Sequence, residues 1–198
     1  IETISEDKFK KLKEVGLHRI TFGMEHGNEK FRREVVKRNY TNKLAIELMK
    51  IPAELDITFS VNNIIGFPGE TRELAFDTIE LNRHFKSDDC SCSVLIPFHG
   101  TEIRTMAENQ GLIDKDSILT IGNSGSESPI DMPQWPAKEV TKLSKTFAMY
   151  VKFPKDRWPE IEKAETDPEV HARLSKEYID TFWSHRDDDL RDAVKGLF

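Results

Sequence analysis

Cysteine is scarce in this sequence: its 198 residues include only Cys90 and Cys92. So few cysteines exclude the disulfide-rich scaffold of a small secreted protein and indicate a cytoplasmic location. The single residue between them makes a mutual disulfide geometrically awkward. We therefore predict two ordinary buried cysteines in a strand.

Long apolar runs and a surface of one charge sign are also missing. No stretch approaches the roughly 18 apolar residues of a membrane-spanning helix, and the net charge of −6 comes from intermixed acidic and basic residues. We expect no membrane partner and, without a basic stripe, no nucleic-acid surface. The start has neither a secretion signal nor an initiating Met, so we expect a longer gene product.

Common catalytic and metal motifs are absent too. The six histidines show no H-x-H or H-E-x-x-H spacing, and no G-x-S-x-G or P-loop pattern occurs. We therefore predict no metal ligands in this chain.

Three strand-like runs are present, at residues 18–25, 57–65 and 90–96, each followed by a helical pattern. Such repeated units predict a parallel sheet. Capping residues predict where four of the helices start: Ser5, Asn28, Thr41 and Thr71. Phe9, Leu12 and Val15 predict the apolar face of the first helix, and Pro52 is predicted to end the third.

Apolar residues alternate in each run with small or polar ones. These are Thr21, Gly23, Glu25, Ser60, Asn62, Ser91 and Ser93. The apolar face would pack on helices, and the small, polar face suits the interior of an open barrel that holds a ligand. We predict an α/β fold, the C-terminal half of a partial (β/α) TIM-like barrel with parallel strands, followed by an α-helical extension. The alternative is a mixed sheet with one solvated face; Asn63 fits neither pattern.

The domain organisation is predicted from a change in composition along the chain. Residues 1–113 form the half-barrel, 114–131 a loop or linker, and 132–198 a helical C-terminal extension. A Gly/Ser-rich stretch at 123–129 indicates the loop.

Ligands of β/α barrels bind at the C-terminal ends of the strands. Glu25 ends its strand on the polar face and could accept hydrogen bonds from an amine or hydroxyls; the alternative is a salt bridge. His26 and His99 lie on similar turns, either as proton donors to a substrate or as polar loop residues. Arg38 could neutralise a carboxylate or be solvated at a helix end.

The three turns that follow the predicted strands match a known family in their order and residue types. Residues 22–27 read F-G-M-E-H-G, residues 64–71 read I-I-G-F-P-G-E-T, and residues 97–102 read P-F-H-G-T-E. Over residues 4–113 the chain resembles the second half of the radical S-adenosylmethionine (SAM) barrel. The similar branch includes methylthiotransferases and cobalamin-dependent radical enzymes.

The sequence departs from that family at several points. His26 replaces the usual Ser, His99 the usual Pro, and Asn62 a frequent Asp. The C-x-x-x-C-x-x-C loop that ligates a 4Fe–4S cluster is absent, and two cysteines cannot replace three. We therefore expect the chain alone to be inactive and to require the N-terminal half of the same polypeptide as its partner.

The resemblance implies SAM and a 4Fe–4S cluster as cofactors of the parent protein and leaves cobalamin open. The parent would cleave SAM reductively to a 5′-deoxyadenosyl radical, and this chain alone would bind SAM weakly at most. The implied SAM-site residues are Gly23, Glu25 (at the ribose or amino group), Arg38, Asn62, Ile65, Gly66 and Phe67 (the adenine wall), and Pro97 and Phe98 (its other edge).

Two other functions fit the same residues. The turn at residues 66–71 could bind a phosphate at a helix N-terminus in a non-redox β/α-barrel enzyme acting on a phosphorylated small molecule. Alternatively, the β/α part is a scaffold and the helical tail is a protein-interaction module.

Overall fold

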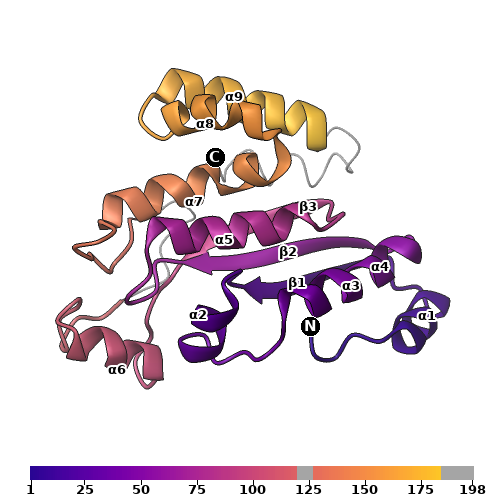
Figure 1. The fold of residues 1–198 in the computed structure, drawn as a ribbon, viewed down its shortest axis with the longest axis horizontal. Coiled ribbons are helices and arrows are strands. Elements are labelled where there is room, and N and C mark those ends of the chain that lie inside the picture. Colours follow the sequence, from indigo (N-terminus) through magenta and orange to yellow (C-terminus); the bar gives the residue numbers. More distant parts are fainter. Residues whose placement is uncertain (120–126, 184–198) are drawn as a thin grey trace.

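The structure, a computed structural model, describes residues 1–119 and 127–183. Its sheet has three parallel strands in the order β1–β2–β3, which confirms the predicted parallel arrangement (Figure 1). The strands are β1 (Arg19–Glu25), β2 (Thr58–Ile65) and β3 (Asp89–Val94). All three C-terminal ends, with the turns that follow them, therefore lie at one edge of the sheet.

The helices between the strands begin largely where the sequence predicts. Asn28, Thr41 and Thr71 each accept a hydrogen bond from the backbone N–H three residues later, whereas Ser5 precedes its helix without such a bond. The helices in this part are α1 (Glu6–Glu14), α2 (Glu29–Glu34), α3 (Asn42–Leu48), α4 (Lys50–Glu54), α5 (Arg72–Arg83) and α6 (Glu102–Asn109).

Two of the helix predictions are wrong. Val15 is 82% exposed, because α1 ends at Glu14 and the chain turns away at Gly16, whose φ is 98°. Pro52 does not end the third helix but lies inside the short helix α4. A proline is tolerated there because the first turn of a helix has no intrahelical partner for its N–H groups.

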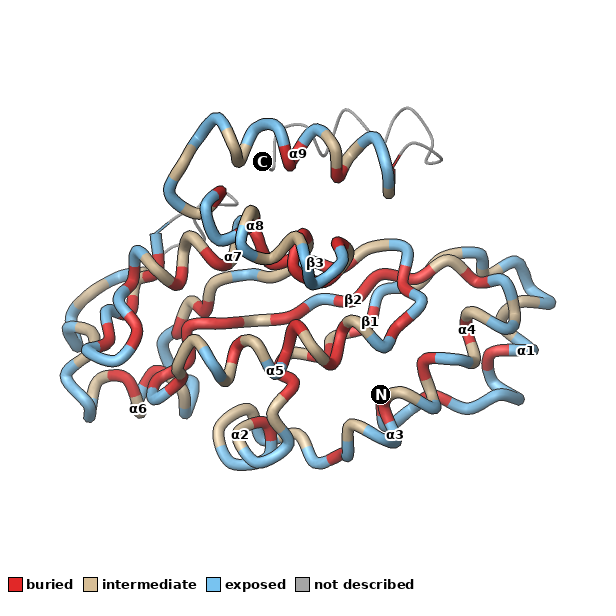
Figure 2. The backbone as a smooth tube through the Cα atoms, turned by 45° about the horizontal axis from the view of Figure 1, so that its top comes forward, coloured by how far each residue is buried: buried red, intermediate tan, exposed pale blue. Residues whose placement is uncertain are grey.

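The two faces of the sheet differ as predicted. On one face, apolar strand residues pack against helices, and buried residues dominate β2 (Figure 2). On the other face, the hydroxyls of Thr21 and Ser60 are 2.8 Å apart, and Ser91 donates to the side-chain oxygen of Asn62 over the same distance.

Asn63, which fitted neither face pattern, lies on the helix-covered face. Its amide pairs reciprocally with that of Asn82 in α5, with N···O distances of 3.2 and 2.9 Å. The side-chain nitrogens also donate to the carbonyls of Ser91 and Thr78. A fully paired amide can be buried at little cost, which explains a polar residue at this position.

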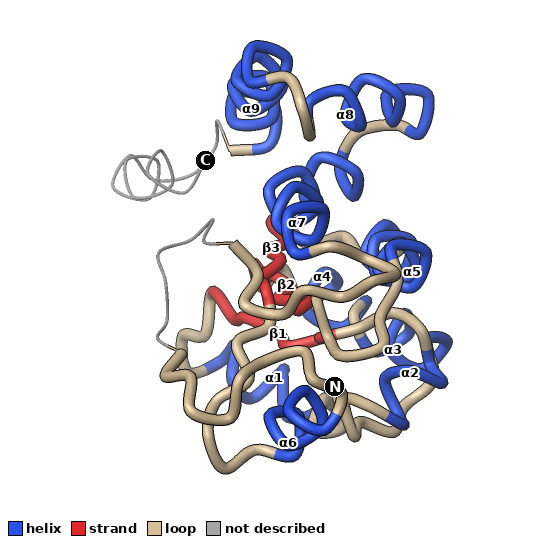
Figure 3. Tube along the Cα trace, turned by 90° about the vertical axis from the view of Figure 1, so that its left-hand side faces the viewer, coloured by secondary structure: helices blue, strands red, loops and turns tan. Residues whose placement is uncertain are grey.

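The helical extension shares its core with the sheet. Figure 3 shows α7 (Ala137–Lys152) beside α5 on one side of the strands, and α7 packs on β3. One guanidinium nitrogen of Arg83 donates to the carbonyls of Tyr150, Val151 and Phe153 and so caps the end of α7. A 3₁₀ turn (Lys155–Arg157), α8 (Trp158–Ala164) and α9 (Pro168–Phe182) follow.

Two parts of the sequence predictions fall outside the described residues: most of the Gly/Ser-rich loop, and the extension beyond Trp183. Within residues 1–119 and 127–183, no helix is both long and apolar enough to cross a membrane.

Candidate functional site

The turn after β1 brings three predicted site residues together. The Glu25 backbone is left-handed, with a φ of 65°, and its carboxylate folds back over Gly23. A Cβ at Gly23 would lie 2.4 Å from that carboxylate, so a larger residue there would displace the Glu25 side chain from this position. Arg38 lies 3.4 Å from the Glu25 carboxylate and donates to the Gly23 carbonyl at 3.3 Å. The salt-bridge alternative for Glu25 is therefore present in the structure.

This ion pair is partly buried. The Glu25 side chain is 17% exposed and that of Arg38 is 39% exposed. Burial raises the pKa of Glu25 above its ordinary value, and the nearby Arg38 opposes this effect. A half-buried carboxylate with a cationic neighbour is suited to receive an amine or hydroxyl from a ligand.

Four side chains from residues 32–42 anchor the backbone of this turn. Each donates a hydrogen bond to a different carbonyl of residues 23–27. The pairs are Arg38 with Gly23, Tyr40 with Met24, Arg32 with His26, and Asn42 with Gly27. Burial raises the pKa of Tyr40 to about 12, so its phenol remains protonated as a donor at neutral pH. The turn that carries Glu25 is thus fixed without a ligand.

The turn after β2 is organised by Glu70, which sequence reasoning did not single out. Its fully buried carboxylate accepts the N–H groups of Gly66 and Phe67 at 2.7 and 2.9 Å. Gly66 has a φ of 87°, which favours glycine. Glu70 therefore shapes the turn from within.

The predicted adenine wall lies partly inside the core. The Ile65 and Phe67 side chains are buried among apolar residues, so these residues could reach a ligand only through their backbone. Ile64 is partly exposed, on the same face as Asn62. Because side chains alternate along a strand, the positions of Ser60 and Asn62 could have indicated Ile64 from the sequence.

His26 and His99 have different environments. His26 is completely buried and hydrogen-bonded to Glu70, so its predicted access to a substrate is wrong. His99 is exposed, and its Nε2 donates to the Ser117 carbonyl at 3.1 Å. Beside it, Pro97 is buried, whereas Phe98 is 44% exposed and is the accessible part of the predicted second edge.

The two cysteines have the predicted character. Cys90 is buried, Cys92 is partly buried, and neither is in a disulfide. Burial raises the pKa of the Cys90 thiol to about 12 and that of Cys92 well above its usual value. Among the described residues, no cluster of three or more His, Cys, Asp or Glu side chains could hold a metal ion.

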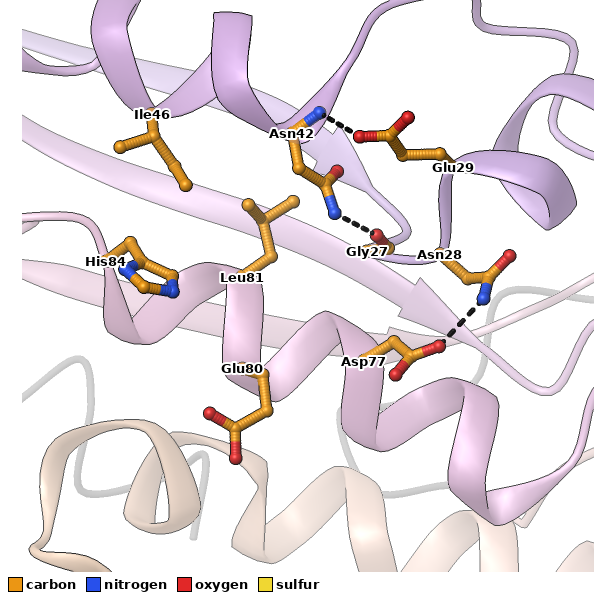
Figure 4. A pocket seen from close by; sticks show the side chains of 9 residues that line it. All are labelled: Gly27, Asn28, Glu29, Asn42, Ile46, Asp77, Glu80, Leu81 and His84. Atoms are coloured by element: carbon orange, nitrogen blue, oxygen red, sulfur yellow. Dashed lines mark hydrogen bonds between the residues drawn. The ribbon is translucent and has the colours of Figure 1, made fainter.

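A pocket of about 310 Å³ lies on the helix-covered side, between the turn after β1, α3 and α5 (Figure 4). Several of its polar groups are already paired. Asn28 donates to Asp77 at 2.8 Å, and Asn42 donates to the Gly27 carbonyl and, through its backbone, to Glu29. These contacts anchor the turn, so we assign this region to support rather than to ligand binding.

These features define the class of the molecule: an α/β protein of the partial β/α-barrel type, with polar turns at the C-terminal ends of its strands. Residues 1–81 match the family model of the Radical SAM superfamily. Over this region, which is less than half of the chain, the protein is similar to the radical SAM superfamily.

Three known proteins are similar to parts of this chain. An uncharacterized methyltransferase of Pyrococcus horikoshii is 28% identical over 103 residues, which are 52% of this chain and 22% of the relative. The tRNA-2-methylthio-N(6)-dimethylallyladenosine synthase of Clostridium beijerinckii is 40% identical over 67 residues, 33% and 14% of the two chains. That of Halalkalibacterium halodurans is 32% identical over 88 residues, 43% and 16%. This chain thus spans less than a quarter of each relative's length.

Proposed function

We propose that this chain supplies the adenosine-facing part of a radical SAM enzyme, in which Glu25 binds the amino group or ribose of SAM. The observation that carries the proposal is the half-buried Glu25 carboxylate, held at a strand's C-terminal end within the region that matches the family. Because its turn is already anchored, little ordering is required on binding. Arg38 favours the ionised carboxylate despite its partial burial.

The other predicted residues complete the proposed site. Asn62 and the exposed Phe98 offer a polar and an apolar contact. The Gly66 amide already donates to Glu70, so Gly66 would contribute the shape of its turn. Ile65, Phe67 and Pro97 would support this surface from the core, since their side chains are buried.

The residues present suit SAM better than they suit an iron–sulfur cluster. A polar turn with a half-buried carboxylate fits an amine or ribose, whereas the two cysteines are too few for a cluster and have raised pKa values. In the proposed parent enzyme, the N-terminal half of the same polypeptide holds the cluster. When bound, the cluster supplies the electron for the family's general reaction, reductive cleavage of SAM.

The chain on its own should bind no stoichiometric cluster iron and should release no 5′-deoxyadenosine from SAM, because it lacks a third cysteine. Anaerobic reconstitution with iron and sulfide, followed by iron analysis and a product assay, measures both. A chain of the Clostridium beijerinckii relative, reconstituted in parallel, is the comparison. Cluster iron near four per chain would show that other residues ligate it.

For the reaction class, we propose transfer of a methyl or methylthio group. The support is the names of the relatives, a methyltransferase and two tRNA-2-methylthio-N(6)-dimethylallyladenosine synthases. Assaying the parent enzyme for transfer from isotopically labelled SAM tests it, and SAM cleavage without any transfer would argue for another class.

The two alternative functions have less support. The amides of Gly66 and Phe67, which a phosphate would need, already donate to the Glu70 carboxylate. The first helix of the tail is not free to act as a separate module, because α7 packs on β3 and shares the apolar core of the sheet.

Replacing Glu25 with Gln should raise the Kd of the parent enzyme for SAM about tenfold to hundredfold, since a hydrogen bond to a charged group contributes roughly 1.5–3 kcal/mol. The melting temperature should not fall near neutral pH. Burial raises the pKa of this acid, so the folded state favours its protonated form and gains nothing from ionisation as the pH rises. Anaerobic calorimetric titration beside a melting curve gives both values.

Glu14→Gln is the matched control, because Glu14 is an exposed residue at the end of α1. Wild-type affinity should also decrease as the pH falls through the raised pKa of Glu25, and this decrease should be lost in Glu25→Gln. An unchanged Kd with a lowered melting temperature would instead make Glu25 a purely structural ion-pair partner.

A further inference from the structure

His26 lies between the turn after β1 and the turn after β2. Its Nδ1 accepts the backbone N–H of Asn28 at 3.1 Å. The proton of a neutral imidazole must then be on Nε2, which lies 3.1 Å from Glu70 Oε1 and donates to it. The ring is completely buried and stacks on Phe31, with 4.5 Å between centroids.

The partner carboxylate connects this contact to the second turn. Glu70 uses its other oxygen to accept the amides of Gly66 and Phe67. Its backbone carbonyl accepts from Gln134, in the segment that leads into α7. Glu70 therefore joins residues from both strand ends through its carboxylate and contacts the tail through its backbone carbonyl.

The side-chain hydrogen bond between His26 and Glu70 matters because the pairing of β1 with β2 is irregular near the end of β1. Gly23 pairs with Asn62, but Glu25 pairs with Asn63, so the register shifts between them. The left-handed Glu25 lies within this shift. Regular strand pairing therefore does not fix the position of Glu25 relative to the Gly66 turn.

We propose that His26 is a positioning residue: its hydrogen bond to Glu70 holds the Glu25 turn in register with the Gly66 turn, so that both contact an adenosyl ligand as one unit. This rests on the proposed function and adds the coupling between its two turns. The chemical reason is that a ligand bridging two turns binds more tightly when their spacing is fixed beforehand.

Two variants of His26 separate its two hydrogen bonds. Asn places an acceptor near the position of Nδ1 but cannot reach Glu70, whereas Gln places a donor near Nε2 and gives up the bond from Asn28. His26→Asn should raise the Kd of the parent enzyme for SAM about tenfold, and His26→Gln should restore it to within about twofold of wild type. His84→Asn is the control, because His84 is exposed at the end of α5. Equal affinities of His26→Asn and wild type would overturn the proposal.

A double-mutant cycle tests whether His26 acts through Glu25. His26→Asn should have little further effect on Kd once Glu25 is Gln, because the group to be positioned is gone. Full additivity of the two effects would overturn the positioning role.

Hydrogen exchange on the 198-residue chain gives a readout without any ligand. His26→Asn should increase exchange at the Gly66 and Phe67 amides, although the substitution is in the other turn, and His26→Gln should restore protection. Unchanged exchange would overturn the coupling. If wild-type parent enzyme binds no SAM while this exchange effect is present, the proposed function fails and the structural link stands.

Discussion

Replacing Glu70 with Ala should lower the free energy of unfolding by about 3–5 kcal/mol, because each buried donor left without its acceptor costs roughly 1–3 kcal/mol. The change leaves three buried donors, the amides of Gly66 and Phe67 and Nε2 of His26, without their acceptor. For a chain of this length, the melting temperature should fall by roughly 6–20 °C. Calorimetry and denaturant titration measure both quantities.

Glu73→Ala provides the control, since Glu73 is exposed in the first turn of the same helix. It should change the free energy of unfolding by about 0.5 kcal/mol or less. If Glu70→Ala were as stable as this control, the three donors would have found other acceptors, and Glu70 would not organise the turn.

Replacing Gly27 with Ala should destabilise the chain by about 3 kcal/mol or more, at the upper end for an overpacked site. The added Cβ would lie 2.2 Å from the Asp77 carbonyl oxygen and 2.5 Å from the Thr78 Cα. Both are backbone atoms of α5, so the turn and the helix would have to separate. The Gly27 amide would then lose its 2.9 Å hydrogen bond to the Thr78 hydroxyl.

Gly100→Ala separates this clash from ordinary backbone strain. Gly100 has a φ of 83°, and a Cβ there would meet nothing within 4 Å. Its cost should be only the left-handed penalty of roughly 1–2 kcal/mol. Equal melting temperatures for the two variants would show that α5 moves aside easily.

Local patterns in the sequence predicted much of this fold. Strand alternation gave the apolar and polar faces of the sheet, and Asn28, Thr41 and Thr71 marked helix starts because capping acts over three residues. The sequence also predicted that Glu25 lies at the end of its strand, and it gave a salt bridge as the alternative role of this residue.

Long-range pairing is what the sequence did not reveal. His26 and Glu70 are 44 residues apart, and Asn63 and Asn82 are 19 apart, so their burial depends on partners that no local pattern identifies. A histidine in a turn is ordinarily solvated; here a carboxylate from the neighbouring unit makes its burial favourable. The left-handed backbone of Glu25 likewise has no signal in its residue type.

The buried Cys90 of β3 can report when this part of the structure opens. Thiol reagents attack the thiolate, and the raised pKa of Cys90 leaves almost none of it at neutral pH in the native state. Labelling of Cys90 therefore requires its burial to be lost, as when β3 separates from α7, which packs on it. The alkylation rate, followed over a range of denaturant concentrations, thus measures how often that layer exposes its interior.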